Sequence, residues 1–328
     1  MGNPASIVSR PVSAALGVDN NLMTSGAGTD NTLKLNPEFP QCIGTPGCTA
    51  GITGQLPIDF VPPFTNAFPL VQTFRIVKPS NYARTVFIEA LQAAGVTVDA
   101  APVAENPVNL LPAKNSYQPG ALLATLVGMP DSDNAKLVLK VSYNIGADTS
   151  LVLYGLTQGV DTMDASLQAE QKNLSKNYGI PNSEYHFVDG SGGGETSATN
   201  GAVTHFLTDM IGSPNFDVYF AAFPLLGVDG SLAFVTDFES DPTLAGAAGQ
   251  VSAKTGTFLA AASGGLVLKG QAFGGYVHAA SGQQLVYQLV VNNVKVSSLS
   301  DVMKVFQDEG TISAMLWRDN LLVILISG

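Results

Sequence analysis

Charged side chains are scarce in this sequence, and positive charge is the scarcer kind. Asp, Glu, Lys and Arg together make up 12% of the 328 residues, about half the share usual in a globular protein. The net charge is −11, from 26 acidic and 15 basic residues, and Lys and Arg form no cluster. These numbers exclude nucleic-acid binding, which needs a basic surface, and attachment to anionic lipid through a polybasic patch.

Metal-binding side chains are also few. The three histidines, His186, His205 and His278, show no ligand spacing, so we expect no metal site built on them. The two cysteines, Cys42 and Cys48, are separated by Ile-Gly-Thr-Pro-Gly, which favours a tight loop and a local disulfide bond. Free thiols, or a metal bound with help from elsewhere, remain alternatives. A disulfide would imply an oxidising compartment.

Long apolar runs are absent as well. No stretch reaches the roughly 20 residues that a membrane-spanning helix needs, so we expect no transmembrane segment. The apolar residues 321–326 are too few for a span and indicate a buried strand. The opening Met1-Gly-Asn-Pro lacks the basic and apolar regions of a signal peptide, and we expect none in this chain.

Two kinds of periodicity divide the chain. Residues 1–65 are rich in Gly, Pro, Asn and Thr and indicate loops and short strands, either in a disordered leader or in the remnant of a small β-rich module. From Phe74 we expect a helix over 82–91, with a capping residue in 79–81 and Gly95 as terminator, and then a strand over 96–99. Further helices are expected near 120–127, over 138–156 with an interruption near Ser142, and over 163–177. A last helix of this region is expected over 202–211, capped by Thr199 or Asn200.

Beyond Gly249 the pattern changes from helix to strand. We expect strands over 251–261, 270–279 and 284–293, the last two joined by a hairpin turn, and then a short helix over 300–309 that Gly310 ends. Helices followed by an antiparallel meander and a closing helix predict an α+β fold, with helices packed on an antiparallel sheet.

The most informative stretch is Lys254-Thr255-Gly256-Thr257, on the first of these strands. Lys254 and Gly256 point to one side of the strand and Thr255 to the other. A lysine aimed into a cleft can hold a carboxylate or move a proton, and a glycine lets a substrate backbone approach. The N–H of Thr257 is placed to donate to a developing oxyanion. By itself the stretch is also compatible with an exposed strand lysine next to a turn.

Three shorter motifs precede this strand, and each one alone is compatible with a surface turn. Ser142-Tyr143-Asn144 interrupts a helical stretch, and its hydroxyl and amide can both face a cleft. Asp189-Gly190-Ser191-Gly192 is a tight turn that lacks the first glycine of a nucleophile elbow. The segment 227–232, Gly-Val-Asp-Gly-Ser-Leu, follows about 25 residues before the lysine.

In this order, the motifs of residues 74–316 resemble the DacB-like D-alanyl-D-alanine carboxypeptidase/endopeptidase group, which are low-molecular-mass penicillin-binding proteins. The resemblance implies a β-lactamase/transpeptidase-like antiparallel sheet flanked by helices. Ser142 and Asn144 would fill the second motif of the superfamily, and Lys254, Thr255 and Gly256 the third. The substrate would be the D-alanyl-D-alanine end of a peptidoglycan stem peptide, hydrolysed outside the cytoplasm through serine acylation without a cofactor or metal. β-Lactams would be acylating inhibitors.

The first motif of that superfamily, Ser-x-x-Lys, occurs nowhere in the sequence, since none of the 11 lysines has a serine three positions before it. We therefore expect residues 1–65 to be the remnant of an inserted loop- and β-rich domain, and 66–328 the C-terminal part of the penicillin-binding domain, incomplete at its N-terminus. The nucleophile would come from a missing N-terminal segment, and residues 321–326 would cover the open sheet edge. Deleting a nucleophile removes on the order of 10⁶-fold of the rate. Two alternatives remain: a non-catalytic module that binds cell-wall peptides, and an esterase that uses Ser191 or Ser142.

Overall fold

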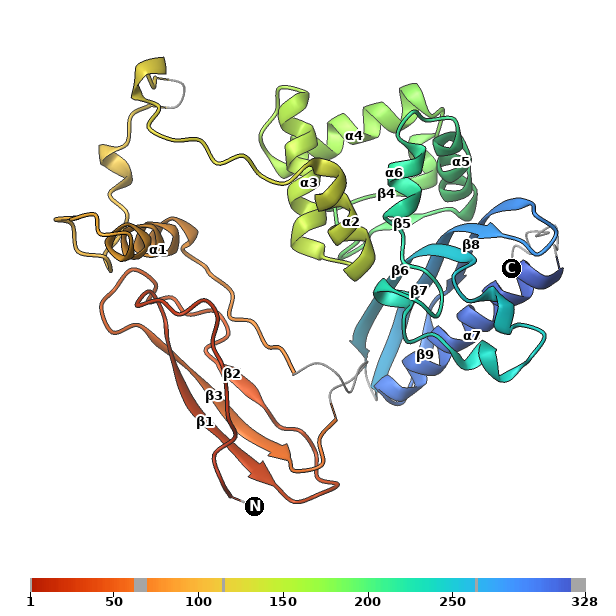
Figure 1. Ribbon diagram of the computed structural model, residues 1–328, viewed down its shortest axis with the longest axis horizontal. Coiled ribbons are helices and arrows are strands. Elements are labelled where there is room, and N and C mark those ends of the chain that lie inside the picture. Colours follow the sequence, from red (N-terminus) through yellow and green to blue (C-terminus); the bar gives the residue numbers. More distant parts are fainter. Residues whose placement is uncertain (1, 62–69, 114–115, 263–264, 320–328) are drawn as a thin grey trace. The chain divides into compact units, whose positions relative to one another are not determined.

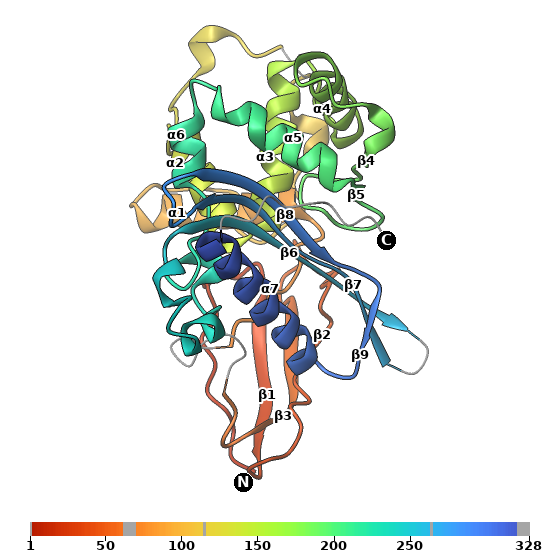
Figure 2. The ribbon, with the colours of Figure 1, turned by 90° about the vertical axis from the view of Figure 1, so that its right-hand side faces the viewer.

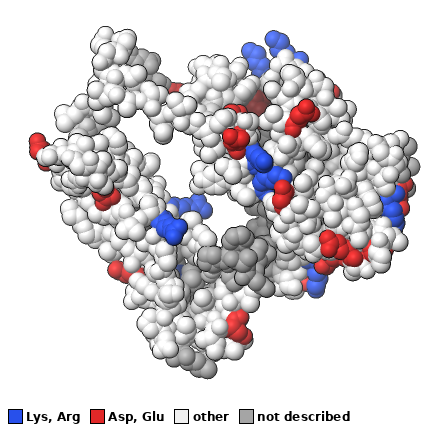
Figure 3. Space-filling view, viewed as in Figure 1, with Lys and Arg blue, Asp and Glu red and all other residues white. Residues whose placement is uncertain are grey.

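The computed structural model describes residues 2–61, 70–113, 116–262 and 265–319. The chain forms two compact units, Met1–Thr125 and Leu126–Gly328, which we describe separately. The composition of the sequence places a boundary earlier, at residue 65, and the assignment of residues 1–65 to an inserted domain stays a prediction. The predicted strand over residues 321–326 lies outside the described residues. On the face drawn in Figure 3 charged side chains form only small, separate patches, as the low charge content requires.

The first unit contains a small mixed sheet and one long helix (Figure 1). Strand β3 (Thr49–Pro57) lies between β1 (Gly17–Ser25), to which it is parallel, and β2 (Lys34–Asn36), to which it is antiparallel. A disulfide bond joins Cys42 and Cys48 in the loop before β3, as their spacing predicts. Helix α1 (Pro79–Ala93) packs on this loop, because buried Asn81 donates to the carbonyl of Ile43 at 3.0 Å.

Three expectations for this unit need correction. Ser80 and Asn81 lie inside α1 instead of capping it, and Gly95, with φ of 82°, follows its end as expected. Residues 96–99 form no strand, since no described strand lies beside them to supply hydrogen bonds. The helix expected near 120–127 is reduced to one 3₁₀ turn, Pro119–Ala121, because Gly120 and Gly128 weaken helix formation there.

The second unit begins with five helices: α2 (Asp131–Val141), α3 (Asn144–Thr157), α4 (Met163–Asn177), α5 (Asn200–Ile211) and α6 (Phe216–Ala221). Between α4 and α5 lies a two-stranded ribbon of β4 (Tyr185–His186) and β5 (Ser197–Ala198). The side chain of Thr199 caps α5 by accepting from the N–H of Ala202 at 3.1 Å, as predicted. The interruption expected near Ser142 is the break between α2 and α3.

An antiparallel sheet follows these helices, with the strand order β6 (Val251–Ala262), β7 (Gly265–His278) and β8 (Gln284–Val291); the short β9 (Val294–Val296) also pairs with β7. Figure 2 shows α5 and α6 on one face of the sheet and α7 (Leu299–Asp319) across the other. Phe273, Tyr287 and Phe306 fill the core under α7, and Tyr276 and Phe223 fill the core under the other helices. The predicted α+β architecture is confirmed.

Helix α7 does not end at Gly310, contrary to the prediction. A Cβ atom at this position would lie 2.2 Å from Cγ1 of Val235, so the glycine allows the helix to approach its neighbour closely. The glycine therefore serves helix packing and not helix termination, and its intrinsic cost of about 1 kcal/mol within a helix is offset by the tertiary contacts along α7.

One residue of α7 makes stability depend on pH. Glu309 is fully buried, and burial raises the pKa of its carboxyl to about 8, with Gln271 opposing the shift. The unfolded pKa is about 4.3, so the folded state binds the proton more tightly. The stability that this preference contributes is fully present below the unfolded pKa and is lost as the pH rises through about 8.

We predict that Glu309→Gln reduces the loss of stability between pH 5 and pH 9. One pKa unit corresponds to about 1.4 kcal/mol, so the relative stabilisation at pH 9 should reach a few kcal/mol. Urea unfolding at both pH values measures it, with Asp308→Asn on the exposed side of α7 as the control. An equal loss of stability with pH in the Glu309 variant and the unsubstituted chain would show that Glu309 titrates normally.

Candidate active site

The structure brings Ser142 and Lys254 into direct contact, although they are 112 residues apart in the chain. Nζ of Lys254 donates to Oγ of Ser142 at 2.7 Å and also to the carbonyl oxygen of Thr255. A serine between two helices thus meets a lysine on the edge strand β6. This hydrogen bond joins the two motifs that the sequence singles out, while their catalytic roles remain predictions.

Ser142 owes its position to an uncommon backbone conformation. It ends α2 with φ of 55° and ψ of 53°, in the left-handed region, where a residue with a side chain costs about 1–2 kcal/mol. Asn293 is the only other non-glycine residue with positive φ among those described. Such strain persists only where the surrounding structure holds it. It lets α2 end and α3 begin within two residues, so that Asn144 is already the first residue of α3.

Asn144 lies exposed at the first position of α3, and its side chain makes no hydrogen bond to a described residue. Its amide is therefore available to a ligand at the same corner as the Ser142 hydroxyl.

The residues that follow Lys254 on β6 have different surroundings. Thr255 is buried, with its hydroxyl 2.7 Å from that of Ser231. Gly256 borders open space, because a Cβ atom there would meet no atom within 4 Å. The hydroxyl of Thr257 donates inward to Oε1 of Gln271 at 2.7 Å. Gly256 therefore leaves room for a ligand to approach the strand backbone next to Lys254.

A segment before β6 holds α2 and the strand together. Lys140 of α2 binds both carboxylate oxygens of Asp229, at 2.6 and 2.7 Å, and the same carboxylate accepts from the N–H of Leu225 at 2.9 Å. Leu225 in turn bridges to Ser252 at the start of β6. Gly230 is needed in this turn, because a Cβ atom there would lie 2.5 Å from the carbonyl oxygen of Lys140.

The sequence motifs include Asp229 and Ser231 but not Lys140. The available signal is its position two residues before Ser142, just ahead of the interruption expected in the helix over 138–156. The partner acid lies 89 residues away, so sequence spacing alone could not pair the two.

The motif around Ser191 forms a hydrogen-bonded turn tied to α3. Burial opposes ionisation of Asp189, but the N–H groups of Gly193, Ser191 and Gly192 outweigh it and lower the pKa of the Asp189 carboxyl. The N–H of Gly190 donates to Asp148 at 3.0 Å. No described hydrogen bond joins Ser191 to Ser142, to Lys254 or to a histidine, so the structure brings no triad together here.

An apolar cavity of about 300 Å³ lies beside Lys254, on the face of the sheet that α5 and α6 cover. Its lining comprises Leu139, Val203, Phe206, Leu207, Tyr219, Phe223, Lys254, Thr255, Gly256, Ala272, Gly274 and Gln288. These surroundings exclude water from the lysine stem, and burial lowers the pKa of Lys254 to about 8. A fraction of Lys254 is therefore neutral near physiological pH and able to accept a proton. Within the described ranges no group of three or more His, Cys, Asp or Glu side chains could hold a metal ion.

Residues 48–309 match the model of the D-Ala-D-Ala carboxypeptidase 3 (S13) family. The chain belongs to this family. Two crystal structures of penicillin binding protein 4 (dacB) from Haemophilus influenzae, one complexed with a β-lactam, resemble it with TM-scores of 0.66 and 18% sequence identity. They cover 97% and 94% of this chain, which in turn spans 66% and 61% of theirs. No curated protein sequence matched.

The likeness to these two structures of one Haemophilus protein establishes the fold of this S13 chain, a DacB-like α+β architecture. At this identity it assigns no residue role. None of the helices in the described part of the chain is long and apolar enough to cross a membrane.

We predict that the side chain of Lys254 titrates with a midpoint near pH 8, below the usual value of about 10.4. NMR of the chain labelled with ¹³C at the lysine ε-carbon would follow the ionisation, and Lys254→Arg would assign the signal. The buried stem, and not the charge of a neighbour, causes the shift, so it should persist in 0.5 M salt, a concentration that would screen a surface interaction. A midpoint of about 10 or higher would contradict the burial of this amine.

Proposed function

We propose that this chain provides the substrate-holding part of a serine-type D-alanyl-D-alanine carboxypeptidase/endopeptidase that acts on peptidoglycan stem peptides. The observation that carries the proposal is the Lys254–Ser142 hydrogen bond next to the open backbone at Gly256. A proton-transfer pair bordering a place for an extended peptide is what acyl transfer at a peptide carbonyl requires.

Each residue then has a distinct task. Lys254, partly neutral at its lowered pKa, takes the proton of the attacking serine hydroxyl through Ser142. The same relay then returns this proton to the departing amine. The Asn144 amide positions the peptide, and the open backbone at Gly256 accommodates its carboxyl-terminal end. The buried Thr255 hydroxyl, 2.7 Å from that of Ser231, holds the strand in place beside it. The N–H of Thr257 donates to the oxyanion that forms when the nucleophile attacks. Electrostatic stabilisation by such donors contributes about 3–4 kcal/mol each in other hydrolases.

The attacking hydroxyl belongs to a Ser-x-x-Lys segment, which the 328 residues do not contain. The apolar cavity beside Lys254 has room for apolar side chains of this segment. In the complete site its serine attacks the carbonyl between the two D-alanines, the terminal D-alanine leaves with a proton, and water then releases the acyl group. β-Lactams acylate the same serine. The Cys42–Cys48 disulfide supports an extracytoplasmic location.

The absence of Ser-x-x-Lys from the 328 residues also favours a second function, which is binding of wall peptides without catalysis. The groups that would recognise a peptide are in place without a nucleophile from the first motif: the amine of Lys254, the amide of Asn144 and the backbone of Gly256.

We predict that fluorescent penicillin forms no adduct with the purified 328-residue chain. Fusion of a Ser-x-x-Lys segment from a solved relative in front of the chain should restore labelling, and Lys254→Ala should lower the labelling rate at least about a hundredfold. Lys269→Ala, which removes an exposed lysine from the neighbouring strand β7, is the matched control. Gel fluorescence over time measures the rate.

An adduct on the unmodified chain would contradict the assignment of the nucleophile to another segment. A folded fusion that binds D-alanyl-D-alanine peptide and never becomes acylated would support the non-catalytic module.

A further inference from the structure

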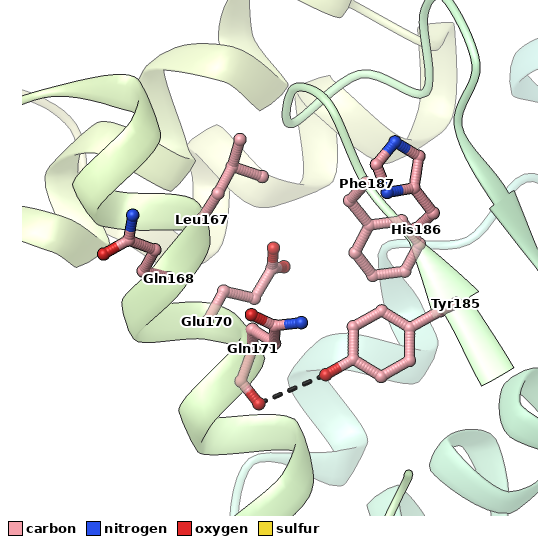
Figure 4. Close-up of a pocket in the computed structure, with 7 residues that line it drawn as sticks. All are labelled: Leu167, Gln168, Glu170, Gln171, Tyr185, His186 and Phe187. Carbon is pink, nitrogen blue, oxygen red and sulfur yellow. Dashed lines mark hydrogen bonds between the residues drawn. The ribbon is translucent and has the colours of Figure 1, made fainter. Parts of the chain in front are cut away.

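A second cavity, of about 310 Å³, lies between α4 and β4 in the second unit (Figure 4). Leu167, Glu170 and Gln171 of α4 line one side, and Tyr185, His186 and Phe187 line the other. None of these residues borders the cavity beside Lys254, so the two cavities are separate. Its volume is at the lower limit of about 300–1,000 Å³ that small-ligand sites occupy, which suits a ligand the size of one side chain.

The carboxyl group of Glu170 points from α4 toward the rings of Tyr185 and Phe187 (Figure 4). It is half-buried, and no Lys, Arg or His among the described residues pairs with it. The Tyr185 hydroxyl is not available to it, because it lies 3.1 Å from the carbonyl oxygen of Gln171 and 3.0 Å from Oδ1 of Asn182. The Glu170 carboxylate is therefore partly withdrawn from water and has no partner within the described part of the chain.

Burial alone raises the pKa of the Glu170 carboxyl. An opposing charge in the cavity would relieve this penalty, since a desolvated carboxylate is stabilised by a nearby cation.

The aromatic wall opposite Glu170 also favours a cation. The rings of Tyr185 and Phe187 lie with centroids 5.0 Å apart and planes inclined by 32°. Aromatic faces attract an ammonium group within about 6 Å of the ring centre, most strongly where water is excluded. Leu167 adds an apolar surface for an alkyl stem. A single carboxylate among aromatic rings does not suit a divalent metal ion, which needs several oxygen ligands.

We propose that this cavity is a binding site for a primary alkylammonium group, with Glu170 as its counter-ion, Tyr185 and Phe187 as the aromatic wall beside the ammonium, and Leu167 beside the alkyl stem. The proposal goes beyond the function proposed above, because it requires neither the missing nucleophile nor the Ser142–Lys254 pair. A lysine-like side chain of a peptide and a free small alkylamine carry the same chemistry, and both fit the cavity volume.

The test uses the 328-residue chain with two probes, Nα-acetyl-lysine methylamide and its uncharged analogue Nα-acetyl-norleucine methylamide. NMR titration should show the lysine probe shifting the amide signals of Tyr185 and Phe187, while the norleucine probe binds at least about tenfold more weakly. n-Butylammonium should shift the same signals if the ammonium and its stem suffice. Shifts with the lysine probe alone would assign the site to peptides.

Glu170→Gln should weaken binding of the lysine probe at least about tenfold. The matched control is Glu195→Gln, which removes an equal charge from an exposed position between β4 and β5 and should leave binding within about twofold. Equal binding of both probes, shifts located elsewhere, equal losses in the two variants, or no binding would each overturn the proposal. The comparison of the two probes on the unsubstituted chain decides the matter even if Glu170→Gln does not fold.

Discussion

The ion pair between Lys140 and Asp229 is the interaction on which the rest of the candidate site depends. It joins the last turn of α2 to the segment that pairs with the start of β6, with both carboxylate oxygens within 2.7 Å of the amine. The lysine side chain is 14% exposed and the aspartate 41%, so the pair is screened less than one on the open surface. It thereby sets where the helix ends relative to the strand edge.

Two local features then determine what meets at this junction. The left-handed backbone of Ser142 ends α2 and presents a hydroxyl. On the other side, β6 pairs with Leu225 only at its beginning, and at Gly256 it borders open space. The contact of Ser142 with Lys254 thus results from a strained turn and from a strand edge that the segment 225–229 holds in place. Its proposed use is proton transfer, because the cavity beside Lys254 lowers the pKa of its amine.

The sequence predicts much of the second unit and less of the first. Periodicity identifies α4 and the strands of the sheet, because long segments with one buried face carry a strong pattern. It fails at 96–99 and 120–127, where short apolar runs have no partner element in the described structure. It also fails at Gly310, where helix–core packing outweighs the local preference of glycine. The motifs mark Ser142 and Lys254, but neither the ion pair of Lys140 nor the cavity at Glu170 could be inferred, since both depend on tertiary contacts.

The hydrogen bond between Ser142 and Lys254 can be measured most directly by a double-mutant cycle. Ser142→Ala, Lys254→Met and the double variant would be unfolded in urea at pH 7, where the amine of Lys254 is mostly protonated. A charge-assisted bond of this kind predicts a coupling free energy of about 1 kcal/mol or more. Changes in unfolding free energy that add to within about 0.3 kcal/mol would contradict the pairing of these two residues.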